Sequence, residues 1–121
     1  MERYGYLGFS FHNNFSIRFE EGENSAKDIS NFLPKKQYYI IPIIDDSSDI
    51  FLKEKDEIEA FIVEKQILNY VLVEIKFSWI LIFDKHRVLS GVGDFIKKKL
   101  KQHVNLRFGN ARIMYASSNE D

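Results

Sequence analysis

Residues 69–100 read Asn-Tyr-Val-Leu-Val-Glu-Ile-Lys-Phe-Ser-Trp-Ile-Leu-Ile-Phe-Asp-Lys-His-Arg-Val-Leu-Ser-Gly-Val-Gly-Asp-Phe-Ile-Lys-Lys-Lys-Leu. Two runs rich in β-branched and aromatic residues flank Lys76, and a third run follows the polar break at residues 84–86. This pattern predicts consecutive antiparallel strands near 68–75, 77–83 and 87–91. The first two runs are too continuously apolar for a sheet with one solvated face. We therefore expect the middle of a sheet that is buried on both sides or nearly so.

The sequence also predicts helices and strands before and after this central stretch. Gly91 and Gly93 end the sheet, and Asp94 is the expected cap of a helix over 94–103. Ser25 is the expected cap of a short helix over 26–32, and the spacing of Ile58, Phe61 and Ile62 predicts a helix over 55–65. The other expected elements are an N-terminal hairpin from 6 to 20, a strand over 38–44 with Pro42 at an edge or bulge, a short strand or helical turn at 50–52, a last strand over 106–115, and a frayed tail over 116–121.

The inward-facing residues follow from the same periodicities. They are expected to be Phe15, Ile17 and Phe19; Ile29, Phe32 and Leu33; Ile58, Phe61 and Ile62; and Phe95, Ile96, Leu100 and Val104. Together these elements predict the α+β class. We expect one domain over residues 1–121, with a central, mainly antiparallel sheet and two or three packed helices.

Length and composition are consistent with such a domain and exclude several classes. The chain has 121 residues, 45% of them hydrophobic, and no cysteine, so disulfides and thiolate metal sites are excluded. No basic region followed by an apolar run begins the chain, and no apolar run is long enough to span a bilayer. We therefore expect a cytoplasmic protein with no membrane association.

Charge is divided along the chain although the formal net charge is only −1. Residues 1–64 hold 7 Lys/Arg and 13 Asp/Glu, whereas residues 65–121 hold 10 and 5. The near-neutral total argues against a general nucleic-acid binder. The acids cluster first at Glu20, Glu21 and Glu23, and then over residues 45–59, at Asp45, Asp46, Asp49, Glu54, Asp56, Glu57 and Glu59.

Histidine is the first residue to consider for catalysis, and the chain has three, each isolated in sequence. His86 follows Asp84 and precedes Arg87, so an enzyme would use Asp84 and His86 as an acid/base pair. No nucleophile is obviously supplied beside them, and a polar hairpin tip is the favoured interpretation.

Three other clusters have a chemical and a structural interpretation. Asp45, Asp46 and Asp49 offer oxygen ligands to a divalent cation, but their spacing is not that of a calcium loop, which favours a solvated turn. Gly91-Val92-Gly93 is an incomplete phosphate-binding pattern, which favours a strand-to-helix turn. The Lys97–Lys101 helix offers phosphate contacts, but a solvated face with lysine stems over apolar surface is favoured. We therefore expect no cofactor and no metal.

Several of these segments together resemble a known set of proteins. They are Tyr70-Val-Leu-Val, Phe77-Ser-Trp-Ile-Leu-Ile, Asp84-Lys-His, and Leu89-Ser-Gly-Val-Gly followed by an acidic residue and a helix. This series, over about residues 58–100, resembles small bacterial immunity proteins encoded beside polymorphic or contact-dependent growth inhibition toxins. Trp79, His86, Gly91 and Gly93 match the shared pattern, and we interpret all four as scaffold.

The resemblance implies a non-enzymatic inhibitor that binds one cognate toxin, often a nuclease, in the producing cell. A nuclease cleft is positively charged, so an acidic patch is its natural complement. The expected partner-binding residues are therefore the acids of 45–59, with Tyr or Phe anchors beside them. The competing hypotheses are a small enzyme using Asp84 and His86, and a nucleic-acid-binding module using Lys97–Lys101. We expect a monomer or a weak dimer.

Overall fold

The central stretch folds, in the computed structural model, into three consecutive antiparallel strands, as the sequence predicts. They are β4 (Tyr70–Glu74), β5 (Ile80–Phe83) and β6 (Val88–Val92). β5 begins later than expected because residues 75–78 form the turn that joins it to β4. The structure describes residues 14–22, 24–43, 49–104, 107–109 and 111–119.

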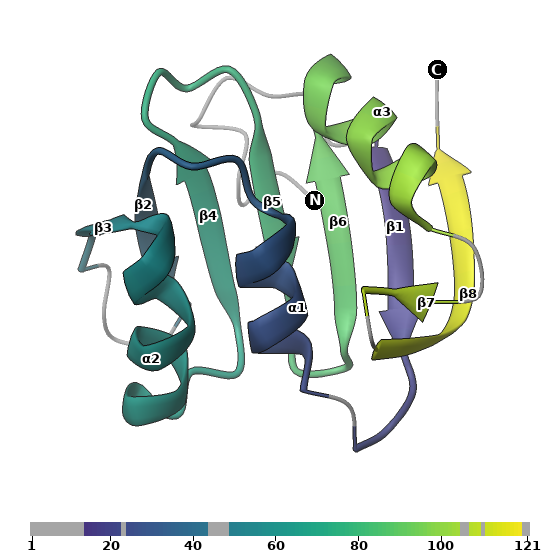
Figure 1. The fold of residues 1–121 in the computed structure, drawn as a ribbon, viewed down its shortest axis with the longest axis horizontal. Coiled ribbons are helices and arrows are strands. Elements are labelled where there is room, and N and C mark those ends of the chain that lie inside the picture. Colours follow the sequence, from purple (N-terminus) through teal and green to yellow (C-terminus); the bar gives the residue numbers. More distant parts are fainter. Residues whose placement is uncertain (1–13, 23, 44–48, 105–106, 110, 120–121) are drawn as a thin grey trace.

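The described strands form a seven-stranded antiparallel sheet, to whose last strand a two-residue strand adds as an eighth. Their order across the sheet is β3-β2-β4-β5-β6-β1-β8-β7 (Figure 1). The remaining strands are β1 (Asn14–Phe19), β2 (Gln37–Pro42), β3 (Phe51–Glu54), β7 (Arg107–Phe108) and β8 (Ala111–Asn119). The prediction of an α+β fold with a mainly antiparallel sheet is confirmed.

Three helices lie on one face of this sheet, in the part of the chain that the structure describes (Figure 1). They are α1 (Ser25–Phe32), α2 (Lys55–Lys65) and α3 (Asp94–His103). Each joins two parallel strands: α1 leads from β1 to β2, α2 from β3 to β4, and α3 from β6 towards β8. The crossover from β1 to β2 runs across the sheet in the opposite direction to the other two crossovers. Its strands also point in the opposite direction, so all three crossovers have the same handedness when their helices lie on the same face. That handedness is the right-handed one that twisted strands favour.

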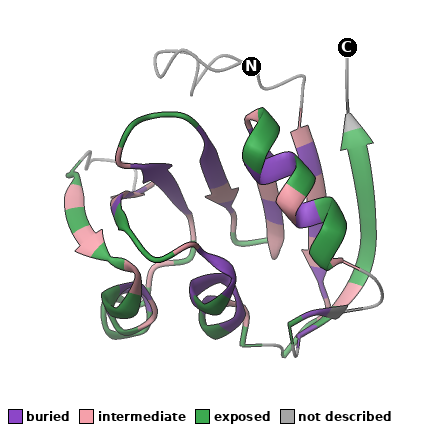
Figure 2. Cartoon of the chain, turned by 45° about the horizontal axis from the view of Figure 1, so that its top comes forward, coloured by how far each residue is buried: buried purple, intermediate pink, exposed green. Residues whose placement is uncertain are grey.

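The core is divided by the sheet into two unequal parts. The larger cluster lies on the helix side and includes Ile17, Ile29, Ile58, Leu72 and Leu100, all fully buried. The smaller cluster consists of Val71, Val73, Ile80 and Val92, with Tyr39, Ile41, Ile43 and Ile82 packed against it. β4 and β5 contribute to both clusters, so the expectation of strands buried on both sides is confirmed for them (Figure 2).

Pro42 lies where its missing N–H has least effect. The N–H of Ile43 donates to the Asn69 carbonyl beside β4 at 2.9 Å, and the direction of the backbone groups alternates along a strand. The nitrogen of Pro42 therefore faces the side of β2 on which β3 lies. The pairing with β3 ends at Ile40, so no β3 carbonyl is left without a donor by Pro42. This agrees with the predicted position at an edge.

Of the two predictions about the chain ends, one is wrong and the other lies partly outside the described residues. The expected hairpin from 6 to 20 includes residues 6–13, which the structure does not describe, and its described part, β1, pairs with β6 along one edge and with β8 along the other. The tail was expected to fray from Ala116, but β8 continues to Asn119 in register with β1. The pairing with β1 supplies hydrogen-bond partners that the polar sequence of this segment does not reveal.

Two helix starts differ by one position from the sequence prediction. The cap of α1 is Asn24, whose Oδ1 accepts from the Lys27 N–H at 3.4 Å, and not Ser25. The cap position of α3 is Gly93, and Asp94 is the first helical residue. Phe95 in that first turn is 53% exposed rather than buried, and its ring stacks on Trp79 with centroids 6.0 Å apart.

Gly93 is required at this position for two physical reasons. Its φ is +113°, which side chains rarely adopt, and a Cβ there would lie 2.8 Å from the Trp79 Cβ and 3.0 Å from the Ser78 carbonyl oxygen. The start of α3 is thus pressed against the turn between β4 and β5. Gly22 also has a positive φ, +88°, but a Cβ there would meet nothing within 4 Å.

We expect Gly93→Ala to lower the free energy of unfolding by about 2–4 kcal/mol, because backbone strain and crowding act together. Gly22→Ala is the matched control and should lose only about 1 kcal/mol, since it carries the strain alone. Urea denaturation of both variants measures the difference. Equal losses would contradict the close contact between Gly93 and Trp79.

Candidate functional site

The structure describes only some of the acidic residues that are predicted to bind a partner. Asp45 and Asp46 lie outside the described residues. Asp49 and the four residues Glu54, Asp56, Glu57 and Glu59 are described, and all except the half-buried Glu59 are exposed. The structure therefore places most of the predicted set on β3 and the first turns of α2.

Two of these acids have a structural role that the sequence analysis did not assign. The Glu57 Oε1 accepts a hydrogen bond from the Glu54 N–H at 2.9 Å, as part of a capping box at the start of α2. Such a bond satisfies a backbone donor that the helix leaves unpaired. Glu54 and Glu57 consequently stabilise α2, whereas Asp56 and Glu59 are available on its surface.

A shallow groove of about 340 Å³ follows the outer side of α2. Its lining consists of Asp56, Glu59, Ala60, Val63 and Glu64. Val63 is 58% exposed, so three carboxylates surround a small apolar strip. The sequence analysis missed Ala60, Val63 and Glu64 as site residues, although their helical spacing from Asp56 places them on one face of the helix.

Two lysines near the start of α2 are held away from the groove. The Lys53 ammonium lies 5.0 Å from the centre of the Phe61 ring, and the Lys55 Nζ donates to the Asn31 carbonyl on α1 at 3.3 Å. Their charges are therefore directed towards the sheet and α1, not into the groove. The outer face of α2 is left with a negative balance.

The aromatic anchors expected beside the acids are absent from this part of the described surface. Phe51 and Phe61 pack against each other with centroids 4.9 Å apart, and Phe61 is buried. The exposed aromatic rings of the described residues lie elsewhere, at Phe77 on the turn after β4, Phe95 at the start of α3 and Tyr115 on β8. Val63 and the nearby Leu68, 64% exposed, are the apolar contacts that the α2 region offers.

The Asp84–His86 turn has the geometry of a hairpin tip. The Asp84 Oδ1 accepts from the backbone N–H groups of His86, at 2.9 Å, and Val88, at 3.2 Å. Arg87 completes the turn with a φ of +69°. The carboxylate therefore shapes the backbone and does not orient the imidazole, as an acid/base pair would require.

The lysines of α3 agree only in part with the favoured interpretation of a solvated face. The Lys99 ammonium lies 4.9 Å from the centre of the Phe32 ring, and that of Lys101 lies 5.9 Å from the Phe15 ring. Lys97 is buried, and Lys98 is exposed. Lys99 and Lys101 thus lie over core aromatics and Lys97 is buried, so the helix presents no continuous row of exposed ammonium groups for a phosphate backbone.

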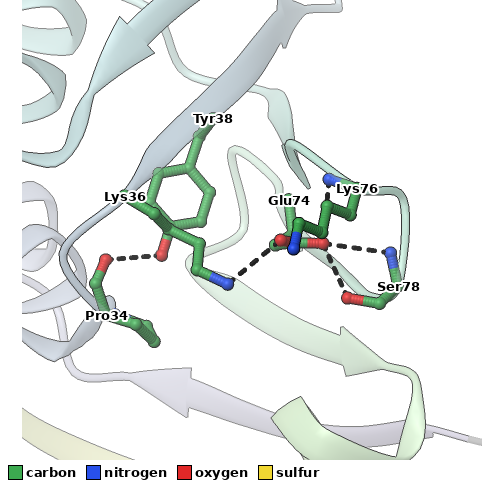
Figure 3. Close-up of polar contacts among 6 residues, drawn as sticks. All are labelled: Pro34, Lys36, Tyr38, Glu74, Lys76 and Ser78. Atoms are coloured by element: carbon green, nitrogen blue, oxygen red, sulfur yellow. Dashed lines mark hydrogen bonds and ion pairs between the residues drawn. The ribbon is translucent and has the colours of Figure 1, made fainter.

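Glu74 is the most perturbed carboxylate of the described residues, and it lies at the end of β4 with only 1% of its surface exposed. Its Oε1 accepts from the Lys76 N–H, the Ser78 N–H and the Ser78 hydroxyl, and its Oε2 accepts from the Lys36 ammonium at 3.0 Å (Figure 3). Burial by itself raises the pKa, but the hydrogen bonds outweigh it and lower the pKa to about 2. A group with that pKa is a poor general base at neutral pH, so its role is structural.

No metal cluster or membrane-spanning helix is found in the part of the chain that the structure describes. No three of its His, Asp and Glu residues lie together as metal ligands would, and no helix is both long and apolar enough to cross a bilayer. Comparisons with protein-family models, curated proteins and solved structures found no match. The candidate site therefore rests on the chain's own geometry.

We expect acid to destabilise the protein through Glu74. Its pKa is about 2 in the folded protein against an ordinary value of 4.5, so the stabilisation is complete above pH 4.5 and is lost as the pH falls towards 2. The loss is at most roughly 3 kcal/mol, and Glu74→Gln should remove this part of the pH dependence. Urea denaturation from pH 7 to pH 2 measures it. Glu64→Gln, an exposed control on α2, should keep the wild-type slope, and an unchanged slope in Glu74→Gln would contradict the assignment.

Proposed function

We propose that this protein is a non-enzymatic inhibitor that binds and neutralises a cognate bacterial toxin in the cytoplasm of the producing cell. The outer face of α2 is the proposed contact surface, through Asp56, Glu59 and Glu64 around Val63. The single observation that carries the proposal is the groove in which these carboxylates surround an exposed apolar strip. The toxin class itself comes from the resemblance of residues 58–100 to immunity proteins.

The distribution of charge over the helices supports this surface. α2 and α3 lie towards opposite ends of the helical layer, with α1 between them (Figure 1). Four acids, Asp56, Glu57, Glu59 and Glu64, thus lie on α2, and the lysines of 97–101 lie on α3. A separation of this kind orients an incoming charged partner before contact and favours a partner with a basic surface at α2.

A nuclease is the toxin class that this surface fits best. Its substrate channel must be basic to hold a phosphate backbone, and an acidic face can occupy the same channel. The Val63 side chain supplies apolar contact area at the centre of the charged groups, where interface energy usually concentrates. Inhibition by occupation requires no reactive group on the inhibitor.

We expect the double variant Glu59→Lys/Glu64→Lys to weaken toxin binding at least 100-fold, because like charges would then face the basic partner. The probe is the C-terminal toxin domain encoded by the neighbouring reading frame, expressed alone. Titration calorimetry measures affinity, and growth of cells that co-express the two proteins measures protection. Glu57 is left unchanged because it caps α2.

The matched control is Glu20→Lys/Glu21→Lys, which makes the same change of net charge in the loop between β1 and α1. It should retain binding and protection, and both doubles should unfold within about 1 kcal/mol of the wild type, as surface substitutions usually do. If the wild-type protein neither binds nor protects, the proposed function is wrong. If both doubles bind as the wild type does, the contact surface is not α2.

A further inference from the structure

The two ends of the sheet differ in how they are protected against further strand pairing. β3 closes one end with only four residues, of which Lys53 and Glu54 are charged. Short strands and lysines are common devices that keep an edge from pairing with another chain. β8 closes the other end, and β7 covers only its first two residues, Ala111 and Arg112.

From Ile113 to Ser117 the outer edge of β8 pairs with no strand of the described residues. This segment contains no charged residue and no proline. Met114 is 55% exposed and Tyr115 48%, and residues 116 and 117 are exposed as well (Figure 2). The one protective device is a bulge at Met114, where the register with β1 shifts, and it leaves the residues after it regularly extended.

We propose that this edge pairs with the same edge of a second copy of the chain, antiparallel and with Ala116 on the twofold axis. Large side chains precede Ala116 in β8, and small ones follow it. Antiparallel self-pairing about this residue places Tyr115 opposite Ser117 of the other copy on the face away from the helices. Each large side chain therefore meets a small one, and no like charges meet.

The surrounding elements leave room for this pairing. α3 packs against β6 and β1, so it does not extend over the exposed part of β8. The dimer would continue one sheet across both copies and keep the helices of both on the same side. α2 lies at the far end of the sheet from β8, so both acidic faces stay free and the inference is independent of the toxin-binding proposal (Figure 1).

The small size of this interface predicts a weak dimer. A strand pair of about five residues is only about 17 Å long and buries less than the roughly 1,000 Å² that stable interfaces exceed. We therefore expect a concentration-dependent equilibrium in the micromolar to millimolar range. Dimers should be visible by sedimentation velocity when the protein is raised from about 10 μM to 1 mM.

Single cysteines give the sharpest test, because the chain has no cysteine of its own. Directly opposed Cα atoms in an antiparallel pair are about 4.5–5.5 Å apart, a distance that a disulfide spans. Ala116→Cys should therefore form a disulfide-linked dimer under mild oxidation. Leu52→Cys, also exposed but on the β3 edge, should cross-link at least tenfold more slowly.

A charge at the axis provides the second test. Ala116→Lys should raise the dimer dissociation constant at least tenfold, because two ammonium groups would face each other, whereas Leu52→Lys should leave it unchanged. A wild-type protein that remains monomeric at 1 mM overturns the proposal. So does a dimer that Ala116→Lys leaves intact, or one in which Leu52→Cys cross-links as fast as Ala116→Cys.

Discussion

One buried carboxylate holds together the place where the central strands and α3 meet. Glu74 ends β4, and its two oxygens gather donors from Lys36, Lys76 and Ser78 (Figure 3). These hydrogen bonds fix the turn between β4 and β5. Across this turn the Glu74 N–H donates to the Trp79 carbonyl, which sets the register of β5 against β4. Trp79 then lies against Gly93, and Gly93 sets where α3 begins. An isolated acid in an apolar run thus organises the centre of the fold.

The turn that Glu74 holds also carries backbone strain at an exposed aromatic residue. Phe77 has a φ of +61°, is 57% exposed, and stacks on Tyr39 with ring centroids 5.5 Å apart. Left-handed backbone at a bulky residue persists only where the surroundings impose it. Here the carboxylate of Glu74 and the stacking on Tyr39 supply that constraint. The stacked rings of Phe77 and Tyr39 are separate from the acidic face of α2.

The same arrangement keeps the two charged helices apart. Three crossovers of one hand place all three helices on one face, in the order that the strand positions dictate. α2 follows the strand at one end of the sheet, and α3 follows β6 towards the other end. The acids of α2 and the lysines of α3 thus come to lie towards opposite ends of the helical layer.

Several elements could be predicted from local sequence because local chemistry decides them. The helices 55–65 and 94–103 have the predicted bounds, and the stripe Ile58, Phe61 and Ile62 is buried as its spacing indicates. The strands of the central stretch were predicted within a few residues. Asp56 and Glu59, two residues of the candidate site, were among the acids that the sequence indicated, because they are clustered along the chain.

What the tertiary structure decided is everything that depends on contacts between distant segments. The pairing of Asn119 with Asn14, the exposure of Phe95 over Trp79, and the use of Glu57 as a cap have no local signal strong enough to reveal them. The sequence by itself determined which residues form strands and helices and which faces are apolar, because those depend on the period of a few neighbouring residues. Only the folded chain decided which edges were paired and which carboxylates remained at the surface, because hydrogen bonds between remote backbone groups form only after the sheet order is set.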